Sequence, residues 1–263
     1  MREFLNTALR FADISRRIII RRAARPKTRL KRDATVVTAA DLAAERALRA
    51  AIAKCFPDHG ILGEEFPPVR PEAEFQWIID PIDGTISFSH GIPFYGTVLG
   101  LHRRGKPLVG VIDLPGLGIR YSAAAGLGAY KNGRRLRLKD LAPEALLSRE
   151  VIATGDRGDF ERCGAGPALD RLQRAHPHVR AYADCMGHGL AAEGAVAAMV
   201  DFGIRLWDLA ATQVLIEEAG GLYRVAHRCE KDGVTRYGII FGKPKAVRWI
   251  SRFFRAVGAP SVR

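Results

Sequence analysis

The stretch that most constrains this chain is WIIDPIDGT, residues 77–85, in which an apolar strand runs directly into two aspartates. Pro81 stands between them. Its ring fixes one backbone torsion and leaves no amide hydrogen for a sheet, so we expect a rigid turn here. In such a turn the carboxylates of Asp80 and Asp83 face one space from two sides, with the carbonyl oxygen of Ile82 between them. Two buried carboxylates this close are costly unless a cation compensates them.

Other acids also stand where apolar segments end. Glu64 and Glu65 follow the run GILG, Asp208 follows RLW, and Asp41 opens an expected helix. Arg205 is the one basic residue within these segments, so cationic side chains do not balance the acids. Hard divalent cations prefer oxygen ligands, and magnesium in particular keeps water ligands and pairs with phosphate oxygens. The pattern therefore favours a metal site.

The residues after Asp83 add a place for an anion. Gly84 permits close approach of the backbone to a ligand. Gly84 and Thr85 are expected to open a short helical turn, whose free amide hydrogens favour a negative group. Cation ligands and an anion cradle in one short peptide indicate a site for a metal-bound phosphate ester.

The rest of the chain reads as a mixture of helices and strands. It has 263 residues, of which 48% are hydrophobic and 26% are charged, as in ordinary globular proteins. Apolar spacing predicts helices over 2–24 and 38–55, the second opened by a capping box of Thr38 and Asp41. The runs 94–102 and 107–114 predict a hairpin. Further expected elements are strands at 150–154, 179–183, 196–201, 221–225 and 237–241, and helices at 158–175, 185–195, 207–219 and from Pro244 onward. This α/β pattern predicts layers of helices and sheets.

Three separated motifs carry a resemblance to a known family. DPIDGT, the upstream GEE and the downstream WDLAATQVLIEEAGG resemble the inositol monophosphatase family of magnesium-dependent phosphatases, and KRDATVVTAAD fits a further family segment. The resemblance covers roughly residues 29–225. It implies an αβαβα layered sandwich and commonly a homodimer. The whole chain, 1–263, would form one phosphatase unit, with an N-terminal half at 1–145 that binds metal and phosphate and a C-terminal half at 146–263 that contributes Asp208 and substrate contacts.

The resemblance also implies a role for each matching residue. The first magnesium would be bound by Glu64, Asp80 and the Ile82 carbonyl, the second by Asp80, Asp83 and Asp208, and a third, weaker ion by Glu64 through water. Glu64 and Thr85 would position the attacking water, with Asp41 hydrogen-bonded to Thr85, so these three are the catalytic candidates. Asp83 and the amides of Gly84 and Thr85 would hold the phosphate. A metal-activated water would then displace the alcohol in line, without a covalent intermediate.

Substrate preference is expected in the segment before Asp208. Asp184 and Asp201 stand where inositol-specific members commonly have a small residue and a glutamate, and the DC-x-G-H sequence resembles histidinol-phosphate phosphatases. Two carboxylates near a leaving group suit a cationic alcohol, so the sequence favours histidinol phosphate over inositol 1-phosphate. Asp201 is shorter than the glutamate of either group, and Asp184 has a simpler interpretation as a helix cap. Both substrates therefore stay open, and adenosine bisphosphate is disfavoured.

Other features predict less. His90 and His188 are weaker candidates for a contact with substrate, and Cys185 is expected to pack rather than attack. The four cysteines form no CxxC pair, so we expect a reducing, cytoplasmic setting. The longest uncharged stretch, 84–101, contains Gly, Ser, His and Pro, which argues against a membrane span.

The charge of the chain is strongly basic. The net charge is +13, and residues 1–32 hold eleven Arg and Lys against Glu3 and Asp13, a net of +9. Such a segment can bind nucleic acid or an anionic surface. Aromatic residues do not interleave with these arginines as base stacking would need, so a solvated helix face is the favoured interpretation and nucleic acid is not an expected partner.

Overall fold

The structure is a computed structural model, which describes residues 1–23, 28–30, 36–141, 149–231, 233–255 and 257. The described chain forms two compact units. The first comprises Met1–Arg135, Asp184–Met186 and Trp207–Glu218, and the second comprises Leu136–Ala183, Gly187–Leu206 and Ala219–Arg263. Trp207–Glu218 thus cluster with the first unit although they lie late in the sequence. The subdivision into 1–145 and 146–263 stays a prediction.

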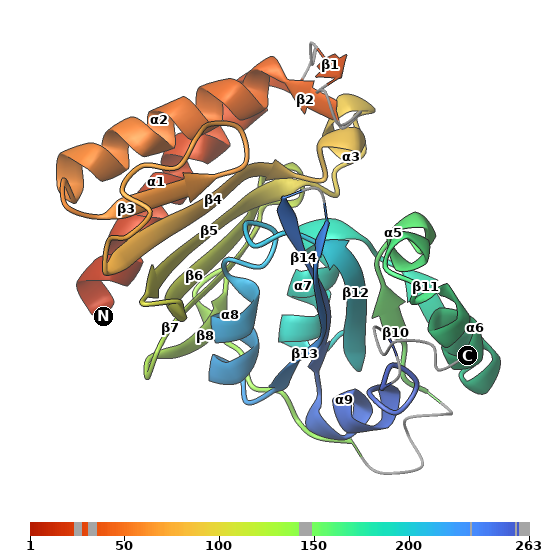
Figure 1. Ribbon diagram of the computed structural model, residues 1–263. Coiled ribbons are helices and arrows are strands. Elements are labelled where there is room, and N and C mark those ends of the chain that lie inside the picture. The colour runs from red at the N-terminus through yellow and green to blue at the C-terminus, as the bar shows by residue number, and fades with distance from the viewer. Residues whose placement is uncertain (24–27, 31–35, 142–148, 232, 256, 258–263) are drawn as a thin grey trace. The chain divides into compact units, whose positions relative to one another are not determined.

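The first unit is built on a seven-stranded sheet (Figure 1). Its strands, in spatial order, are β3 (Gly60–Gly63), β4 (Phe75–Asp83), β5 (Gly96–Arg103), β6 (Lys106–Leu114), β7 (Ile119–Ala124), β8 (Gly128–Lys131) and β9 (Arg134–Arg135). β3 runs parallel to β4, whereas the other neighbours are antiparallel. The expected hairpin is confirmed as β5–β6. Its connecting residues, Arg104 and Gly105, both have positive φ, which suits a two-residue turn.

Two long helices cover one face of this sheet (Figure 1). α1 (Arg2–Arg22) and α2 (Ala39–Cys55) bury their apolar stripes against Trp77, Leu99 and Val111. The expected capping box at the start of α2 is confirmed, because Thr38 and Asp41 bond each other's amides. The apolar stripe on α2 ends at Ile52, since Cys55 is exposed.

The opposite face of the sheet receives α8 (Thr212–Glu218) and the turn before it. Side chains alternate along a strand, so Gly100 lies on the face opposite to Leu99 and Leu101. A Cβ at Gly100 would overlap the carbonyl oxygen of Ala210, and a Cβ at Gly110 would lie 2.7 Å from the Cα of Ala211. Glycines in β5 and β6 therefore allow the segment after Asp208 to sit directly on the sheet.

The second unit is a five-stranded mixed sheet with helices. Its spatial order is β11 (Val179–Ala181), β10 (Ile152–Thr154), β12 (Ala198–Ile204), β14 (Val234–Gly242) and β13 (Leu222–Lys231), with α5 (Arg157–Arg162), α6 (Gly166–Ala175), α9 (Pro244–Ile250) and the part of α7 (Asp184–Glu193) from Gly187 onward. Its apolar core joins Phe160, Leu169, Phe202 and Val247. The single helix expected at 158–175 is wrong. It is two helices, because Gly164 adopts a positive φ between them.

Smaller elements complete the described chain. β1 (Thr28–Leu30) pairs with β2 (Val36–Thr38), α3 (Thr85–Ser89) follows β4, and the 3-10 turn η1 spans Pro115–Leu117. Lys31 and Asp33, part of one segment that resembled the family, lie outside the described residues. In the part of the chain described, each helix falls short of the length and apolar character that a membrane span needs.

Candidate active site

Asp80 and Asp83 lie at the end of β4 around an irregularity in its pairing with β5. Asp80 faces Val98 and Asp83 faces Gly96, so β4 uses one more residue than its partner over this interval. In a regular strand, side chains three positions apart point to opposite faces of the sheet. The one extra residue of the bulge brings the side chains of Asp80 and Asp83 to the same face. The rigid turn expected at Pro81 is instead a bulge within β4, and it is occupied by Pro81, which has no amide hydrogen. Its carbonyl oxygen accepts a hydrogen bond from the buried Thr97 hydroxyl at 2.9 Å.

Asp208 completes a cluster with these two residues. One carboxylate oxygen from each of Asp80, Asp83 and Asp208 lies within 4.8 Å of the others, and we call these three residues the acidic cluster. Asp208 was expected to open a helix, but α8 begins at Thr212 and Asp208 lies in the turn before it. A role as the helix cap is therefore excluded, and its half-buried carboxylate belongs to the cluster.

Glu64 approaches the cluster because β3 and β4 are parallel. Gly63 pairs with Ile79, and the Glu64 amide donates to the Ile79 carbonyl at 3.2 Å, so both strands end at one edge. The pKa of Asp80 lies well above its usual value. Burial is the main cause, followed by the negative charges of Glu64, Asp83, Asp208 and Asp41. The electrostatics thus place these acids around Asp80.

The acidic cluster fits a divalent cation. Among the described residues, the Oδ1 atom of Asp80 is buried without a hydrogen-bond partner. A buried acceptor left unpaired is expensive, and a charged one more so. Several carboxylates around one such atom form the oxygen-rich donor set that Mg²⁺, Mn²⁺ and Ca²⁺ take. The residues present therefore fit a hard metal ion.

Asp41 links α2 to the residues after the cluster. Its Oδ2 accepts from the Thr38 amide at 2.9 Å and from the Thr38 hydroxyl, while its Oδ1 lies 3.2 Å from the Thr85 hydroxyl. Thr85 Oγ1 also lies 2.9 Å from the Ile82 carbonyl oxygen. Burial raises the pKa of Asp41. Asp41 is thus both a capping acid and a neighbour of Thr85, which the sequence had left as alternatives.

Gly84 lies in a narrow space at the start of α3. Its φ is 83°, and a Cβ there would lie 2.7 Å from the Phe94 carbonyl oxygen and 3.1 Å from Oδ2 of Asp184. Asp184 itself has φ 60°, a strained value for a residue with a side chain. The Asp184 carboxylate therefore lies beside the backbone expected to hold phosphate.

Cys185, which follows Asp184 in the chain, contacts Asp83 of the acidic cluster. Its amide donates to Asp83 Oδ2 at 2.6 Å. The thiol is fully buried, and burial together with the neighbouring aspartates raises its pKa well above the usual value. A neutral thiol is a poor nucleophile, which agrees with the packing role expected for it.

The remaining candidates have partners of their own. Asp201, in the second unit, is buried. Its Oδ1 accepts from the Phe202 amide at 3.0 Å and its Oδ2 lies 3.3 Å from His188 Nε2. His90 is exposed, and its ring bonds Ser89 within the same loop. The structure thus groups Asp41, Glu64, Asp80, Asp83, Thr85, Asp184 and Asp208 within the first unit, whereas Asp201 and His188 pair in the second.

Sequence reasoning missed Glu45 and Arg49, which contact the loop that follows Glu64. Glu45 lies one helical turn after Asp41 and is completely buried. A glutamate in line with the apolar positions Leu48 and Ile52 was the available signal, because buried charges are rare without partners.

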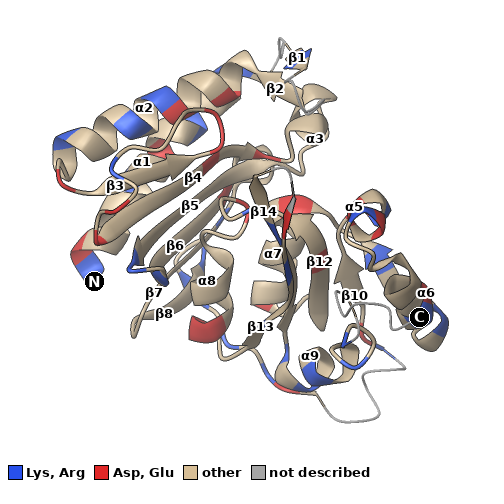
Figure 2. Ribbon diagram, in the orientation of Figure 1, with Lys and Arg blue, Asp and Glu red and all other residues tan. Residues whose placement is uncertain are grey.

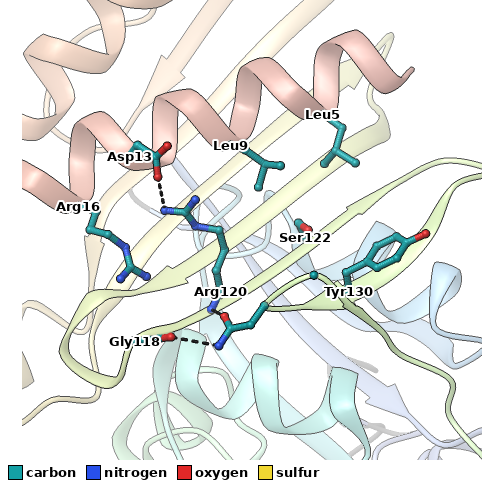
Figure 3. A pocket seen from close by; sticks show the side chains of 10 residues that line it. Leu5, Leu9, Asp13, Arg16, Gly118, Arg120, Ser122 and Tyr130 are labelled. Atoms are coloured by element: carbon teal, nitrogen blue, oxygen red, sulfur yellow. Dashed lines mark hydrogen bonds and ion pairs between the residues drawn. The ribbon is translucent and has the colours of Figure 1, made fainter.

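A separate groove lies on the first unit (Figure 3). It has a volume of about 580 Å³ and is lined from α1 by Leu9, Asp13 and Arg16, and from the sheet by residues that include Arg120 and Tyr130. Arg120 donates to Asp13 at 2.7 Å, and both arginines bond the buried Asp113. Its lining differs from the acidic cluster, and its cations are already paired.

Known proteins match the chain over nearly its whole length. The model of the inositol monophosphatase family matches residues 1–253. This chain belongs to the inositol monophosphatase family. Members of the family are metal-dependent phosphatases, so the chain is a phosphoric ester hydrolase by family, as the sequence resemblance implied.

Relatives within the inositol monophosphatase family include proteins named histidinol-phosphatase and proteins named inositol-1-monophosphatase. The histidinol-phosphatase of Chlorobaculum parvum is 40% identical over 191 residues, covering 73% of each chain. The inositol-1-monophosphatase of Rhizobium meliloti is 34% identical over 197 residues, again covering 73% of each. The solved inositol monophosphatase of Anabaena has a TM-score of 0.82 at 29% identity and covers 100% of this chain and 99% of its own. The expected α/β fold of the inositol monophosphatase type is thereby confirmed.

Proposed function

We propose that this protein hydrolyses a small phosphate monoester with Mg²⁺ bound at the acidic cluster. The observation that carries the proposal is the convergence of Asp80, Asp83 and Asp208, with a buried, unpartnered oxygen on Asp80. Mg²⁺ is the choice because it retains water and binds phosphate oxygens. Two or three ions, held by the cluster, Glu64 and the Ile82 carbonyl, are the expected complement, and when bound they supply an activated water and charge neutralisation.

The protein's own groups orient the reaction. The single proton of Thr85 can go to the Ile82 carbonyl or to Asp41, which lie 2.9 and 3.2 Å from the hydroxyl oxygen. When the Ile82 carbonyl is engaged as a ligand, the Thr85 hydroxyl donates to Asp41, and its lone pairs are then free to accept a hydrogen bond from a water molecule. Glu64 orients the same water, while the amides of Gly84 and Thr85 hold the phosphate. We assign these roles as part of the proposal.

We propose histidinol phosphate as the preferred substrate. Support comes from the Asp184 carboxylate beside Gly84, because a negative group near the leaving alcohol favours a cationic alcohol. The relative at 40% identity is named a histidinol-phosphatase, which points the same way. Inositol 1-phosphate is the second candidate, supported by the relative at 34% identity. Asp201 stays a predicted substrate contact, although its own carboxylate already bonds Phe202 and His188.

A substrate panel tests the proposal. Phosphate release is measured with histidinol phosphate, inositol 1-phosphate and adenosine bisphosphate, with Mg²⁺ and with EDTA. An ionic hydrogen bond contributes about 1.5–3 kcal/mol, so Asp184→Asn should lower kcat/KM for histidinol phosphate about 10- to 100-fold and spare inositol 1-phosphate. Asp58→Asn changes an exposed carboxylate outside the predicted site and serves as the control. Faster turnover of inositol 1-phosphate would reverse the substrate assignment. Phosphate release that is unchanged in EDTA would refute the requirement for a metal ion.

We also propose that the protein is a cytoplasmic homodimer. Light scattering in solution tests the dimeric state. RNA or anionic-surface binding through α1 is the weaker alternative. Its Arg16 is paired with Asp113 at 2.7 Å, and Figure 2 shows basic and acidic residues side by side on α2. A salt-dependent RNA mobility shift in the submicromolar range would favour that alternative.

A further inference from the structure

Glu45 is a buried carboxylate for which the proposed chemistry has no role. It lies in α2, four residues after Asp41, so both side chains leave the same face of the helix. Its exposed fraction is 0%. A carboxylate taken out of water must be paired and hydrogen-bonded to remain charged, so its partners show what it does.

The partners of Glu45 are main-chain groups of the loop that carries Glu64. Oε2 accepts from the Glu65 amide at 2.8 Å, and the Phe66 amide donates to the same carboxylate. At Gly63 a Cβ would overlap Oε1, so only glycine lets the carboxylate lie against the loop. Glu45 thus contacts the backbone immediately before and immediately after Glu64.

Arg49, one turn further along α2, holds the other side of the loop. Its Nε donates to Glu45 Oε1 at 2.8 Å, its Nη2 to the Phe66 carbonyl at 2.8 Å and its Nη1 to the Pro67 carbonyl at 2.9 Å. Its side chain is only 14% exposed. The guanidinium carbon also lies 5.7 Å from the centre of the Phe66 ring. Two side chains of one helix therefore bond two amides and two carbonyls of the loop.

The loop needs such support. Residues 64–68 form bends and irregular backbone, and fixing such a segment costs conformational entropy. The negative charge of Glu64 faces those of Asp80 and Asp41, which pushes the loop away from the cluster when a cation is absent. Hydrogen bonds to charged groups are stronger than those between neutral groups, so the contacts of Glu45 and Arg49 oppose both effects.

We propose that Glu45 and Arg49 are positioning residues that fix the backbone of residues 64–67 and so hold the Glu64 carboxylate beside the acidic cluster, ready for a divalent cation. The inference rests on the proposed function only in placing a cation there. A purely structural role for the pair predicts lower stability alone. A positioning role predicts, in addition, weaker metal binding and a looser loop in a protein that remains folded.

The test uses full-length protein stripped of metal and the variants Glu45→Ala, Glu45→Gln and Arg49→Ala. Leu48→Ala is the matched control, because Leu48 is equally buried on the same helix but packs in the apolar core. Binding of Mn²⁺ is followed by the electron paramagnetic resonance signal of the free ion. We expect Glu45→Ala and Arg49→Ala to raise the Kd about tenfold, which corresponds to about 1.4 kcal/mol. Leu48→Ala should leave the Kd within about twofold of wild type, although truncating such a core leucine lowers the stability of the protein.

Hydrogen exchange gives a second, metal-independent measurement. The amides of residues 64–66 should exchange at least tenfold faster in Glu45→Ala than in Leu48→Ala when both are folded in EDTA. Glu45→Gln keeps one acceptor oxygen but loses the ion pair with Arg49, so it should fall between wild type and Glu45→Ala; it also carries the test if the alanine variant fails to fold. Unchanged Mn²⁺ binding in Glu45→Gln and Arg49→Ala, or equal weakening by Leu48→Ala, would overturn the proposal.

Phosphate release by the wild-type protein separates this inference from the proposed function. Wild-type protein that binds Mn²⁺ and loses that binding on Arg49→Ala, yet releases no phosphate from any ester tested, would keep the positioning role and refute the phosphatase assignment. Wild-type protein that hydrolyses an ester, with Arg49→Ala binding Mn²⁺ equally well, would keep the phosphatase and refute the positioning role.

Discussion

Neutralising Asp80 should stabilise the metal-free protein while removing its response to Mg²⁺. The Oδ1 atom of Asp80 is buried without a partner among the described residues, and burial, together with four neighbouring acids, raises the pKa of the group. Asn keeps the shape of the side chain, removes the charge, and its amide hydrogens can donate to the carboxylates of Asp83 and Asp208. Asp80→Asn therefore relieves a cost that the wild-type protein carries for its site.

The expected gain in stability of the metal-free Asp80→Asn variant follows from the unpaired oxygen of Asp80. An unsatisfied buried polar group costs about 1–3 kcal/mol, so the metal-free variant should gain that amount. A change of 1 kcal/mol shifts the Tm by about 2–4 °C in a protein of roughly this size. Wild-type protein should recover its deficit on binding, because a ligand at one hundred times its Kd adds about 2.7 kcal/mol.

Thermal unfolding in EDTA and across a Mg²⁺ titration measures both effects. Asp113→Asn is the matched control, since Asp113 is equally buried but pairs with Arg16 and Arg120 at 2.7 and 2.6 Å. Breaking those pairs should cost about 3 kcal/mol, so the two substitutions should move the Tm in opposite directions. A lower Tm for Asp80→Asn in EDTA, or an equal rise with Mg²⁺ in the variant and the wild type, would refute the reasoning.

Three further predictions concern the support of the site, pH and catalysis. Gly110→Ala places a Cβ 2.7 Å from the Cα of Ala211, so calorimetry should show a loss of about 1–3 kcal/mol, together with weaker Mn²⁺ binding; unchanged stability would contradict the close packing. Burial lowers the pKa of His102 below its ordinary 6.5, so the folded state binds protons less well than the unfolded state. The contribution of His102 to stability should therefore be full above pH 6.5 and be lost as the pH falls through the folded pKa. The slope of Tm against pH should flatten in His102→Gln, and an unchanged slope would contradict this assignment. Thr85→Val removes the hydroxyl that lies 3.2 Å from Asp41, so kcat should fall at least about 100-fold in phosphate-release assays with a Tm within a few degrees of wild type, whereas retained kcat would exclude the proposed role.

The acidic cluster could be predicted in part from the sequence, because two of its carboxylates, those of Asp80 and Asp83, are close neighbours along the chain. Asp80, Pro81 and Asp83 lie within four positions of one another, so their two carboxylates were predicted to face one space, although the expected turn is a bulge within β4. The short hairpin, the capping box at Thr38 and most strands were likewise predictable, since each depends on residues within a few positions of one another.

What the sequence did not reveal depends on contacts between distant residues. The late start of α8 accompanies the close packing of Ala210 on Gly100. The break at Gly164, by contrast, is local, and the prediction of a single helix overlooked it. Glu45 lies in line with the apolar positions Leu48 and Ile52 of α2, which signals its burial, but this spacing does not reveal its partners in the loop that carries Glu64. Partners that lie close only in the fold leave no periodic signal in the sequence.

Anomalous diffraction from crystals grown with Mn²⁺ tests the central claim most directly. If carboxylates from distant segments hold a divalent cation, a strong anomalous peak should appear about 2.1 Å from oxygens of Asp80, Asp83 and Asp208. Ordered carboxylates with no peak among them, at Mn²⁺ concentrations that support phosphate release, would contradict the account.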